Sequence, residues 1–183
     1  NLWRDFLLIT MSEYELTIES ARLRLEPYEL KHIDGLRAMD SDVEIMRYIG
    51  DGTIKTHEQT VASIERVQLR WRQRGYSWWA IIEKETAEVI GAACLQHLAN
   101  LDGAPLELGW RLRKEQQGKG YATEAAKAII HFAVERFNAA HLVAVAHPEN
   151  LASHKVMQRL GMTYVGIEEH YDQPCVVYEL KIK

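Results

Sequence analysis

The sequence predicts an α/β fold, or α+β by some conventions, in which helices flank a mixed, mostly antiparallel central sheet. Three observations support this class. Runs rich in β-branched and aromatic residues, separated by short polar turns, occupy the centre of the chain. Runs with helical spacing of apolar residues lie before and after them. Toward the C-terminus a strand, a glycine-containing loop, a helix and another strand follow one another, as in a crossover between parallel strands.

The first part of the chain predicts one strand and three helices. Residues 21–28 alternate apolar and charged side chains, so we expect a short strand with one exposed face. Apolar residues at helical spacing predict two short helices within residues 28–50. Thr56 and Gln59 have the spacing of a capping box, and the helix that they begin should end at Gly75.

Strands dominate the middle of the chain and alternate with helices after it. The short links between the first three of these strands predict an antiparallel meander. In chain order we expect strands at residues 77–84, 88–98 and 106–112, a helix to about residue 137, a strand at 141–146, a helix at 150–160, and strands at 163–169 and 175–182.

Length and charge limit the classes of protein to which the chain can belong. With 183 residues it is long enough for one well-buried core and short for two, so we expect a single domain over residues 11–183. Residues 1–10 precede Met11, and we interpret them as an upstream or artificially added extension. A formal net charge of -4 argues against a general nucleic-acid-binding protein.

Cysteine usage and hydropathy predict a cytoplasmic protein. Cys94 and Cys175 are the only cysteines, and they form neither a metal-ligand spacing nor a disulfide framework, so we expect a reducing compartment and no metal. No apolar run approaches the ~20 residues of a membrane span, so we expect no membrane partner. A homodimer is a reasonable expectation because two-fold dimers are the commonest oligomers.

The loop "QQGKGYA" (residues 116–122) is the strongest indication of a ligand site. Gly118 and Gly120 let backbone N–H groups approach a ligand, and the following helix N-terminus favours an anion such as a phosphate. A lone GxG can also be a simple turn that begins a helix. A Walker loop is excluded, because no Ser or Thr follows Lys119 in register. A dinucleotide fingerprint is weak, because Thr123 occupies its third glycine position.

Several ordered motifs together resemble the GCN5-related N-acetyltransferase (GNAT) superfamily. Gln117, Gly120 and Ala122, written as Q-x-x-G-x-A, resemble its acyl-CoA pyrophosphate loop. "PLELGWRL" is similar to the strand before that loop, and "HPENLASHKVMQRLGM" is similar to its asparagine-containing segment. The segments "ARLRLEPY", "GKGYATEA" and "NLAS" resemble sequences of the RimJ/RimL-like branch. The resemblance covers roughly residues 20–182.

This resemblance implies acetyl-CoA as the cosubstrate. The loop amides would hold its pyrophosphate, and its pantetheine would run beside a strand that separates from its neighbour. Arg113 and Lys119 would assist electrostatically, although solvated surface charges are the plainer interpretation of each. The implied contacts are Leu108, Trp110, Leu112, Arg113, Gln117, Gly118, Lys119, Gly120, Tyr121, Ala122, Asn150 and Ser153.

The catalytic candidates also follow from the resemblance. Glu107 matches the position of the general base in some members, with an ordinary exposed or salt-bridged strand carboxylate as the alternative. His97 could act directly or through water, although a lone strand histidine is more often structural. Many relatives place a tyrosine where this chain has Met157, so the proton for the leaving thiolate would come from Ser153, which could instead belong to a helix cap.

The acceptor should be a primary amine. Near neutral pH, deprotonating a lysine costs about 4 kcal/mol and an α-amine under about 1 kcal/mol, which favours a protein or peptide N-terminus. The resembled branch acetylates ribosomal-protein N-termini, but a small-molecule amine and a non-catalytic CoA-binding module remain alternatives. Acidic residues within 39–57 could attract a cationic amine, or they could form a solvated loop. The candidate pocket aromatics are Trp71, Trp78, Trp79 and Trp110, although aromatic residues on strands and helices are more often core residues.

Overall fold

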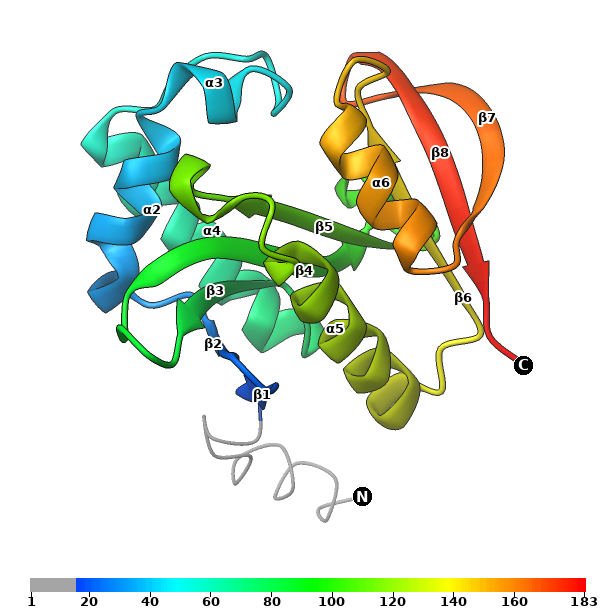
Figure 1. Cartoon of the computed structure of the whole chain (residues 1–183), viewed down its shortest axis with the longest axis horizontal. Helices are drawn as coiled ribbons and strands as arrows, with labels where there is room; N and C mark the ends of the chain where they lie inside the picture. Colours follow the sequence, from blue (N-terminus) through cyan, green and yellow to red (C-terminus); the bar gives the residue numbers. More distant parts are fainter. Residues whose placement is uncertain (1–15) are drawn as a thin grey trace.

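A sheet of eight strands forms the centre of the computed structural model, which describes residues 16–183 (Figure 1). The predicted extension, residues 1–10, lies outside the described residues. In chain order the strands are β1 (Ile18–Glu19), β2 (Leu23–Pro27), β3 (Trp78–Glu83), β4 (Val89–His97), β5 (Leu106–Leu112), β6 (His141–Ala146), β7 (Thr163–His170) and β8 (Gln173–Lys181).

The strand order in the sheet is β1-β2-β3-β4-β5-β6-β8-β7. Neighbouring strands are antiparallel except β5 and β6, which are parallel because a loop and a helix connect them. The predicted meander is β3-β4-β5, and the predicted crossover joins β5 to β6. The mixed, mostly antiparallel sheet with flanking helices confirms the predicted fold class.

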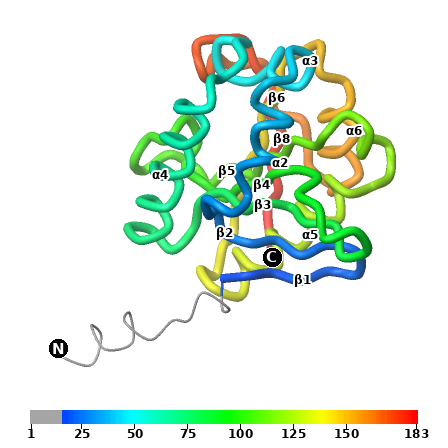
Figure 2. The backbone as a smooth tube through the Cα atoms, turned by 90° about the vertical axis from the view of Figure 1, so that its left-hand side faces the viewer, coloured from blue at the N-terminus to red at the C-terminus, as the bar shows by residue number. Residues whose placement is uncertain are grey.

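The helices connect the strands and cover the sheet. In chain order they are the short 3₁₀ turn η2 (Leu30–His32), α2 (Ile33–Asp40), α3 (Val43–Met46), α4 (His57–Arg74), the turns η3 (Leu98–Asn100) and η4 (Lys114–Gln116), α5 (Tyr121–Phe137) and α6 (Leu151–Arg159). Helix α5 lies on one side of strands β3, β4 and β5, and α4 lies on the other (Figures 1 and 2).

Helix α4 has both of its predicted ends. The Thr56 backbone N–H donates to Gln59 Oε1 (2.8 Å), and the Gln59 N–H donates to Thr56 Oγ1 (3.2 Å), which completes a capping box. Gly75 ends the helix with a φ of 79°, a left-handed conformation that glycine adopts without steric cost. Both ends are determined locally, so the helix has a fixed length and a fixed entry into β3.

Two apolar clusters hold the helices on the sheet. The larger one joins the central strands to α2, α4 and α5, and Trp79 sits in it with its ring edge-on to those of Trp71 and Phe132. The smaller one lies between α6 and strands β6 and β8 and includes Met157, which is fully buried. Trp110 packs against both clusters. Trp110 on β5 is therefore held between the core of the β1–β5 part of the sheet and the core beneath α6.

Candidate functional site

A cleft opens where β5 and β6 separate. Their parallel pairing comprises Leu106 with Leu142 and Glu107 with Val143, after which β5 continues to Leu112 and β6 to Ala146 without pairing to each other. The cleft has a volume of about 960 Å³ and is lined by residues from both strands and from α4, α5 and α6. A sheet interrupted at its centre exposes main-chain groups of β5 to a bound ligand, as the expected strand separation requires.

The glycine loop forms one wall of this cleft. Gly118 and Gly120 have φ values of 79° and 80°, in the left-handed region that other residues adopt only under strain. Gly120 is the N-cap of α5 and provides no side-chain cap, and the helical ladder begins with the Glu124 N–H donating to Gly120 O (3.0 Å). The N–H groups of the first turn therefore have no acceptor within the helix and are available to an anion.

Arg22 holds this loop in place, a role that the sequence motifs did not indicate. Its guanidinium donates to Lys119 O (2.9 Å) and to Glu124 Oε1 (2.8 Å), and it lies 4.3 Å from the centre of the Tyr121 ring. Ser20 Oγ donates to the other carboxylate oxygen of Glu124 (2.6 Å). Because Glu124 is neutralised in this way, its charge opposes anion binding at the start of α5 less strongly.

Most of the predicted cofactor contacts do line the cleft, but two basic residues do not. Arg113 pairs with Glu115 (2.9 Å), and the Lys119 ammonium donates to Gln116 Oε1 (3.0 Å). The predicted contacts found in the cleft wall are Leu108, Trp110, Leu112, Gln117, Gly118, Gly120, Tyr121, Ala122, Asn150 and Ser153. The loop therefore presents main-chain amides rather than lysine or arginine side chains.

Thr123 is a further residue of this wall. Its hydroxyl is buried and has no hydrogen-bond partner among the described residues, and the residue lines the cleft in the first turn of α5. A buried hydroxyl without a partner is costly unless a ligand or water completes it. Sequence reasoning considered Thr123 only as the residue that breaks a dinucleotide fingerprint.

Glu107 lies in the cleft at the last residue pair before β5 and β6 separate. Its residue exposure is only 5%, and burial raises the pKa of its carboxyl to about 7, although hydrogen bonds from Tyr171 and Gln96 act in the opposite direction. The Tyr171 hydroxyl donates to Glu107 Oε2 (2.5 Å). An ordinary exposed strand carboxylate is therefore excluded. A carboxyl that titrates near neutral pH can accept and release a proton under physiological conditions.

Tyr171 is the main site residue that the sequence motifs missed. It lies between β7 and β8, where both Tyr171 and Asp172 have positive φ (54° and 58°), which costs non-glycine residues of the order of 1–3 kcal/mol each. The Tyr171 hydroxyl accepts from Gln96 Nε2 and from the Ala99 N–H (both 3.1 Å) while it donates to Glu107. The strained turn thus holds a phenol against the candidate base.

His97 is not part of the cleft. It pairs with Leu106, one residue away from Glu107, so the alternation of side chains along a strand places it on the opposite face of the sheet. Its Nδ1 is 2.7 Å from Ala104 O and its Nε2 is 2.7 Å from the Tyr76 hydroxyl. Both ring nitrogens are used in structural hydrogen bonds. We therefore omit His97 from the proposed mechanism.

The start of α6 forms the wall opposite the glycine loop. Asn150 is the N-cap, and its Oδ1 accepts from the Ser153 N–H (3.3 Å). Both residues line the cleft, and the capping interaction uses the main chain of Ser153 rather than its hydroxyl. Met157, one helical turn further on, faces the smaller apolar cluster and is fully buried. Of these residues, Ser153 offers the cleft a hydroxyl.

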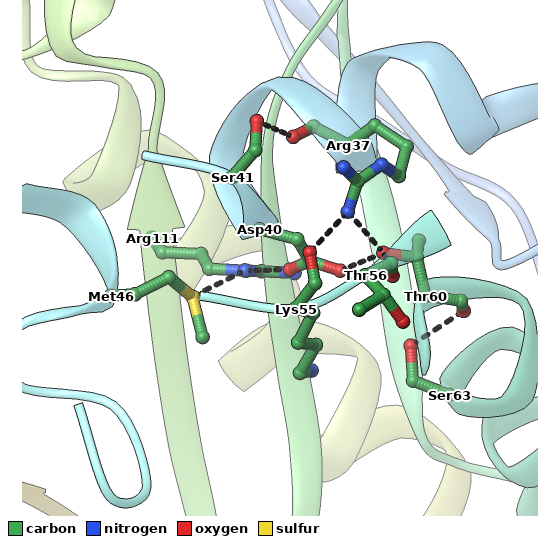
Figure 3. A network of polar contacts seen from close by, with 9 residues as sticks. All are labelled: Arg37, Asp40, Ser41, Met46, Lys55, Thr56, Thr60, Ser63 and Arg111. Carbon is green, nitrogen blue, oxygen red and sulfur yellow. Dashed lines mark hydrogen bonds and ion pairs between the residues drawn. The ribbon is translucent and has the colours of Figure 1, made fainter. Parts of the chain in front are cut away.

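The carboxylates of the acidic segment have structural partners within the protein. Figure 3 shows that Asp40 is bound by Arg111 (2.6 Å) and by the Thr60 hydroxyl (2.7 Å), with Arg37 and Lys55 beside it. The other acids of the segment also have partners: Asp42 caps α3, Asp51 accepts from Thr53, and Glu44 pairs with Lys114. These carboxylates organise the segment that carries α2 and α3.

The four candidate aromatic residues divide equally between site and core. Trp78 and Trp110 line the cleft and are half-buried. Trp71 and Trp79 are buried in the larger apolar cluster, where they pack edge-to-face against each other. Trp110, the residue before Arg111 on β5, therefore stays in the predicted cofactor set, and Trp71 and Trp79 have structural roles.

Within residues 16–183, no helix has the length and apolar character that crossing a bilayer demands. Over the same residues, no three histidine, cysteine, aspartate or glutamate side chains gather in a way that could hold a metal ion.

Comparison with known proteins finds similar acetyltransferases. A family model described as "Acetyltransferase (GNAT) domain" matches residues 22–163. The uncharacterized N-acetyltransferase YnaD of Bacillus subtilis (strain 168) is 27% identical over 149 residues, which are 81% of this chain and 84% of YnaD.

Solved acetyltransferases share the fold. The crystal structure of an acetyltransferase from Agrobacterium tumefaciens has a TM-score of 0.77 and 27% identity, with 91% of this chain and 94% of that chain covered. RimL, a ribosomal L7/L12 alpha-N-protein acetyltransferase solved in complex with coenzyme A, has a TM-score of 0.75 and 20% identity, with 91% and 98% covered. At 20% identity the likeness to RimL concerns the fold.

Proposed function

Because the chain belongs to the GNAT acetyltransferase family, we propose that it moves the acetyl group of acetyl-CoA to a primary amine, specifically the N-terminal α-amine of a protein or peptide. The observation on which this proposal depends is Glu107, a buried carboxyl with a pKa of about 7 in the cleft where β5 and β6 separate.

The cleft residues fit acetyl-CoA. The uncapped first turn of α5 and the left-handed glycines before it can receive a diphosphate through main-chain N–H groups, and the Thr123 hydroxyl needs a partner at the same place. We assign Leu108, Trp110 and Leu112 to the wall along its pantetheine arm. When bound, acetyl-CoA supplies an acyl thioester that is activated toward an amine.

Glu107 would remove the proton of the acceptor amine. Its pKa of about 7 is close to the ~7.8 of an α-amine, so the proton transfer costs only about 1 kcal/mol. The same transfer from a lysine ammonium, with a pKa of ~10.4, would cost about 4–5 kcal/mol. This match supports an α-amine rather than a lysine side chain as the acceptor.

Ser153 would donate the proton that the departing thiolate requires. We expect Ser153→Ala to lower the turnover number by at least about 10-fold and the affinity for acetyl-CoA by a smaller factor, because a general acid acts on the chemical step. Stopped-time assays of thiol release, together with calorimetry of acetyl-CoA binding, would measure both quantities. An unchanged turnover number would remove Ser153 from the mechanism.

The acceptor class can be tested with the purified protein and acetyl-CoA by following free-thiol release and product mass. The panel contains peptides with free N-termini, including those of ribosomal proteins, the same peptides with blocked N-termini and an internal lysine, polyamines and aminoglycosides. We expect the free α-amines to react fastest. Faster reaction of the polyamines or aminoglycosides would favour a small-molecule acetyltransferase, and acetyl-CoA binding without transfer would favour a non-catalytic module.

A further inference from the structure

One face of α4 presents two arginines to the cleft. Ser63, Arg66, Val67 and Arg70 all line it, and their spacing of three, four and seven residues places them on the same face of the helix. Val67 is buried against the core, which fixes the rotation of the helix about its axis. Arg66, which is exposed, and Arg70, which is half-buried, therefore belong to the wall of the cleft on the side of the sheet opposite α5.

These arginines have no counterion in the described part of the chain. Among residues 16–183, neither Arg66 nor Arg70 forms an ion pair, whereas Arg74, the next arginine at the same spacing, pairs with Asp102 (2.5 Å). Like charges four residues apart on a helix repel each other. Burial, together with the charges of Arg66 and Arg74, lowers the pKa of Arg70. The helix thus keeps an unfavourable arrangement of charge facing the cleft.

The acids on this side do not cancel the positive charge. Asp40 is held by Arg111, and Lys55, which also lines the cleft, adds another cation next to that pair. Glu107 is buried and is only partly ionised at neutral pH. At the rim Glu44 pairs with Lys114 (2.5 Å) and Glu149 lies 3.8 Å from Arg47, so these carboxylates have cations of their own.

The two arginines are also separate from the proposed diphosphate site. That site is the first turn of α5, and α4 lies across the sheet from α5 (Figure 2). Arg70 instead lines the same cleft as Tyr171, the residue that contacts Glu107. The cations therefore face the part of the cleft that holds the candidate base.

We propose that the acceptor carries an acidic group near its reactive amine and that Arg66 and Arg70 bind this group while the amine lies at Glu107. This inference rests on the proposed function, because it specifies the acceptor of that reaction. In a peptide the acidic group is a glutamate or aspartate side chain close to the N-terminus, and in a single amino acid it is the α-carboxylate. Two forked guanidinium groups suit a carboxylate, because each can donate two parallel hydrogen bonds.

Matched acceptors test the inference. We compare peptides Ser-Glu-Ala-Ala and Ser-Gln-Ala-Ala, both with amidated C-termini, and the amino acid serine with serine amide. We expect the kcat/KM of the wild-type protein to be at least 10-fold higher for the acidic peptide than for its neutral partner. The serine pair then distinguishes a peptide side chain from an α-carboxylate as the source of the acidic group.

Variants assign the preference to α4. In the double variant Arg66→Gln/Arg70→Gln, the ratio of kcat/KM for the acidic peptide to kcat/KM for the neutral peptide should fall to near one, through a higher KM for the acidic peptide. The conservative variant Arg70→Lys should keep part of the preference that the glutamine variant loses. Arg74→Gln is the matched control, since this arginine lies on the same helix outside the cleft and pairs with Asp102, and it should keep the wild-type ratio. Calorimetry should give the same acetyl-CoA affinity for all of these variants.

The outcomes separate this inference from the proposed function. Equal kcat/KM values for the acidic and neutral peptides, or a ratio that the double variant leaves unaltered, would overturn the inference while acetyl transfer stands. If no amine is acetylated, the proposed function fails, and binding of N-acetyl-Ser-Glu-Ala-Ala measured by calorimetry still decides the role of the arginines. If the wild type and the double variant bound N-acetyl-Ser-Glu-Ala-Ala equally well, the proposed role of the arginines would be wrong.

Discussion

Glu107→Gln should lower kcat/KM for α-amine acetylation at pH 7 by about 100- to 1000-fold, the contribution that a positioned general base usually makes. Glutamine keeps the size of the side chain and can still accept the hydrogen bond from Tyr171, but it cannot take a proton. The dissociation constant of acetyl-CoA should stay within about twofold, because Glu107 is not one of the proposed cofactor contacts.

The pH dependence of the rate gives an independent test of the same role. The base acts when ionised, so the wild-type kcat/KM should rise with pH through about 7, the pKa of Glu107. In Glu107→Gln only the rise that belongs to the acceptor α-amine itself, with a pKa of ~7.8, should remain. The hydrogen bond from Tyr171 lowers that pKa by stabilising the carboxylate. A Tyr171→Phe companion variant should therefore shift the midpoint of the profile to higher pH.

Stability measurements show whether the lost activity comes from lost chemistry. Because burial raises the folded-state pKa of Glu107 above its unfolded value, ionising this group destabilises the fold as pH rises from about 4.5 through 7. Neutral glutamine avoids this loss, so Glu107→Gln should unfold at the same or a higher temperature than the wild type at pH 8. A variant that is fully folded and fully active would exclude Glu107 as the base.

Gly120→Val should weaken acetyl-CoA binding by about 10-fold or more. Gly120 has a φ of 80°, which a β-branched residue adopts only with strain of the order of 1–3 kcal/mol. A Cβ at this position would meet only Arg22 Nη2, at 3.5 Å, so the effect comes from the main chain rather than from a clash. Relaxation of the loop would turn the first N–H groups of α5 away from the cleft. Isothermal titration calorimetry with acetyl-CoA measures the loss.

Gly103→Val is the matched control for this substitution. Gly103 also has a φ of 80° and open space around it, but it does not line the cleft. The same backbone strain is thus introduced away from the cleft, and acetyl-CoA affinity should not change. Equal affinities for the Gly120 and Gly103 variants would mean that the loop does not hold the diphosphate.

Local sequence patterns predicted most of the elements because each pattern has a local physical cause. The capping box and Gly75 located both ends of α4 to within one residue. Runs rich in β-branched and aromatic residues located β3, β4 and β5. The two-residue strand β1 was missed, since so short an element has no periodicity. The position of β8 between β6 and β7 was also not predicted, because strand order depends on contacts distant in sequence.

The sequence indicated the candidate site residues whose proposed role depends on the main chain, and it missed the residues that only tertiary contacts bring into the cleft. Gly118 and Gly120 could be identified because few residues adopt positive φ. Tyr171 could not, because 64 residues separate it from Glu107 and only the β7–β8 turn brings them together. The positive φ of Tyr171 has no marker in the sequence. The sequence shows the spacing of Arg66 and Arg70, but only the tertiary structure shows that this face of α4 lines a cleft.

The short β5–β6 pairing changes which part of the sheet is best protected from solvent. In most sheets the central amides exchange their hydrogens slowest and the edges fastest. Here the amides of residues 108–112 that point away from β4 lack a strand partner at the very centre. Their deuterium uptake therefore depends on what fills the gap, so the middle of this sheet can report ligand occupancy directly.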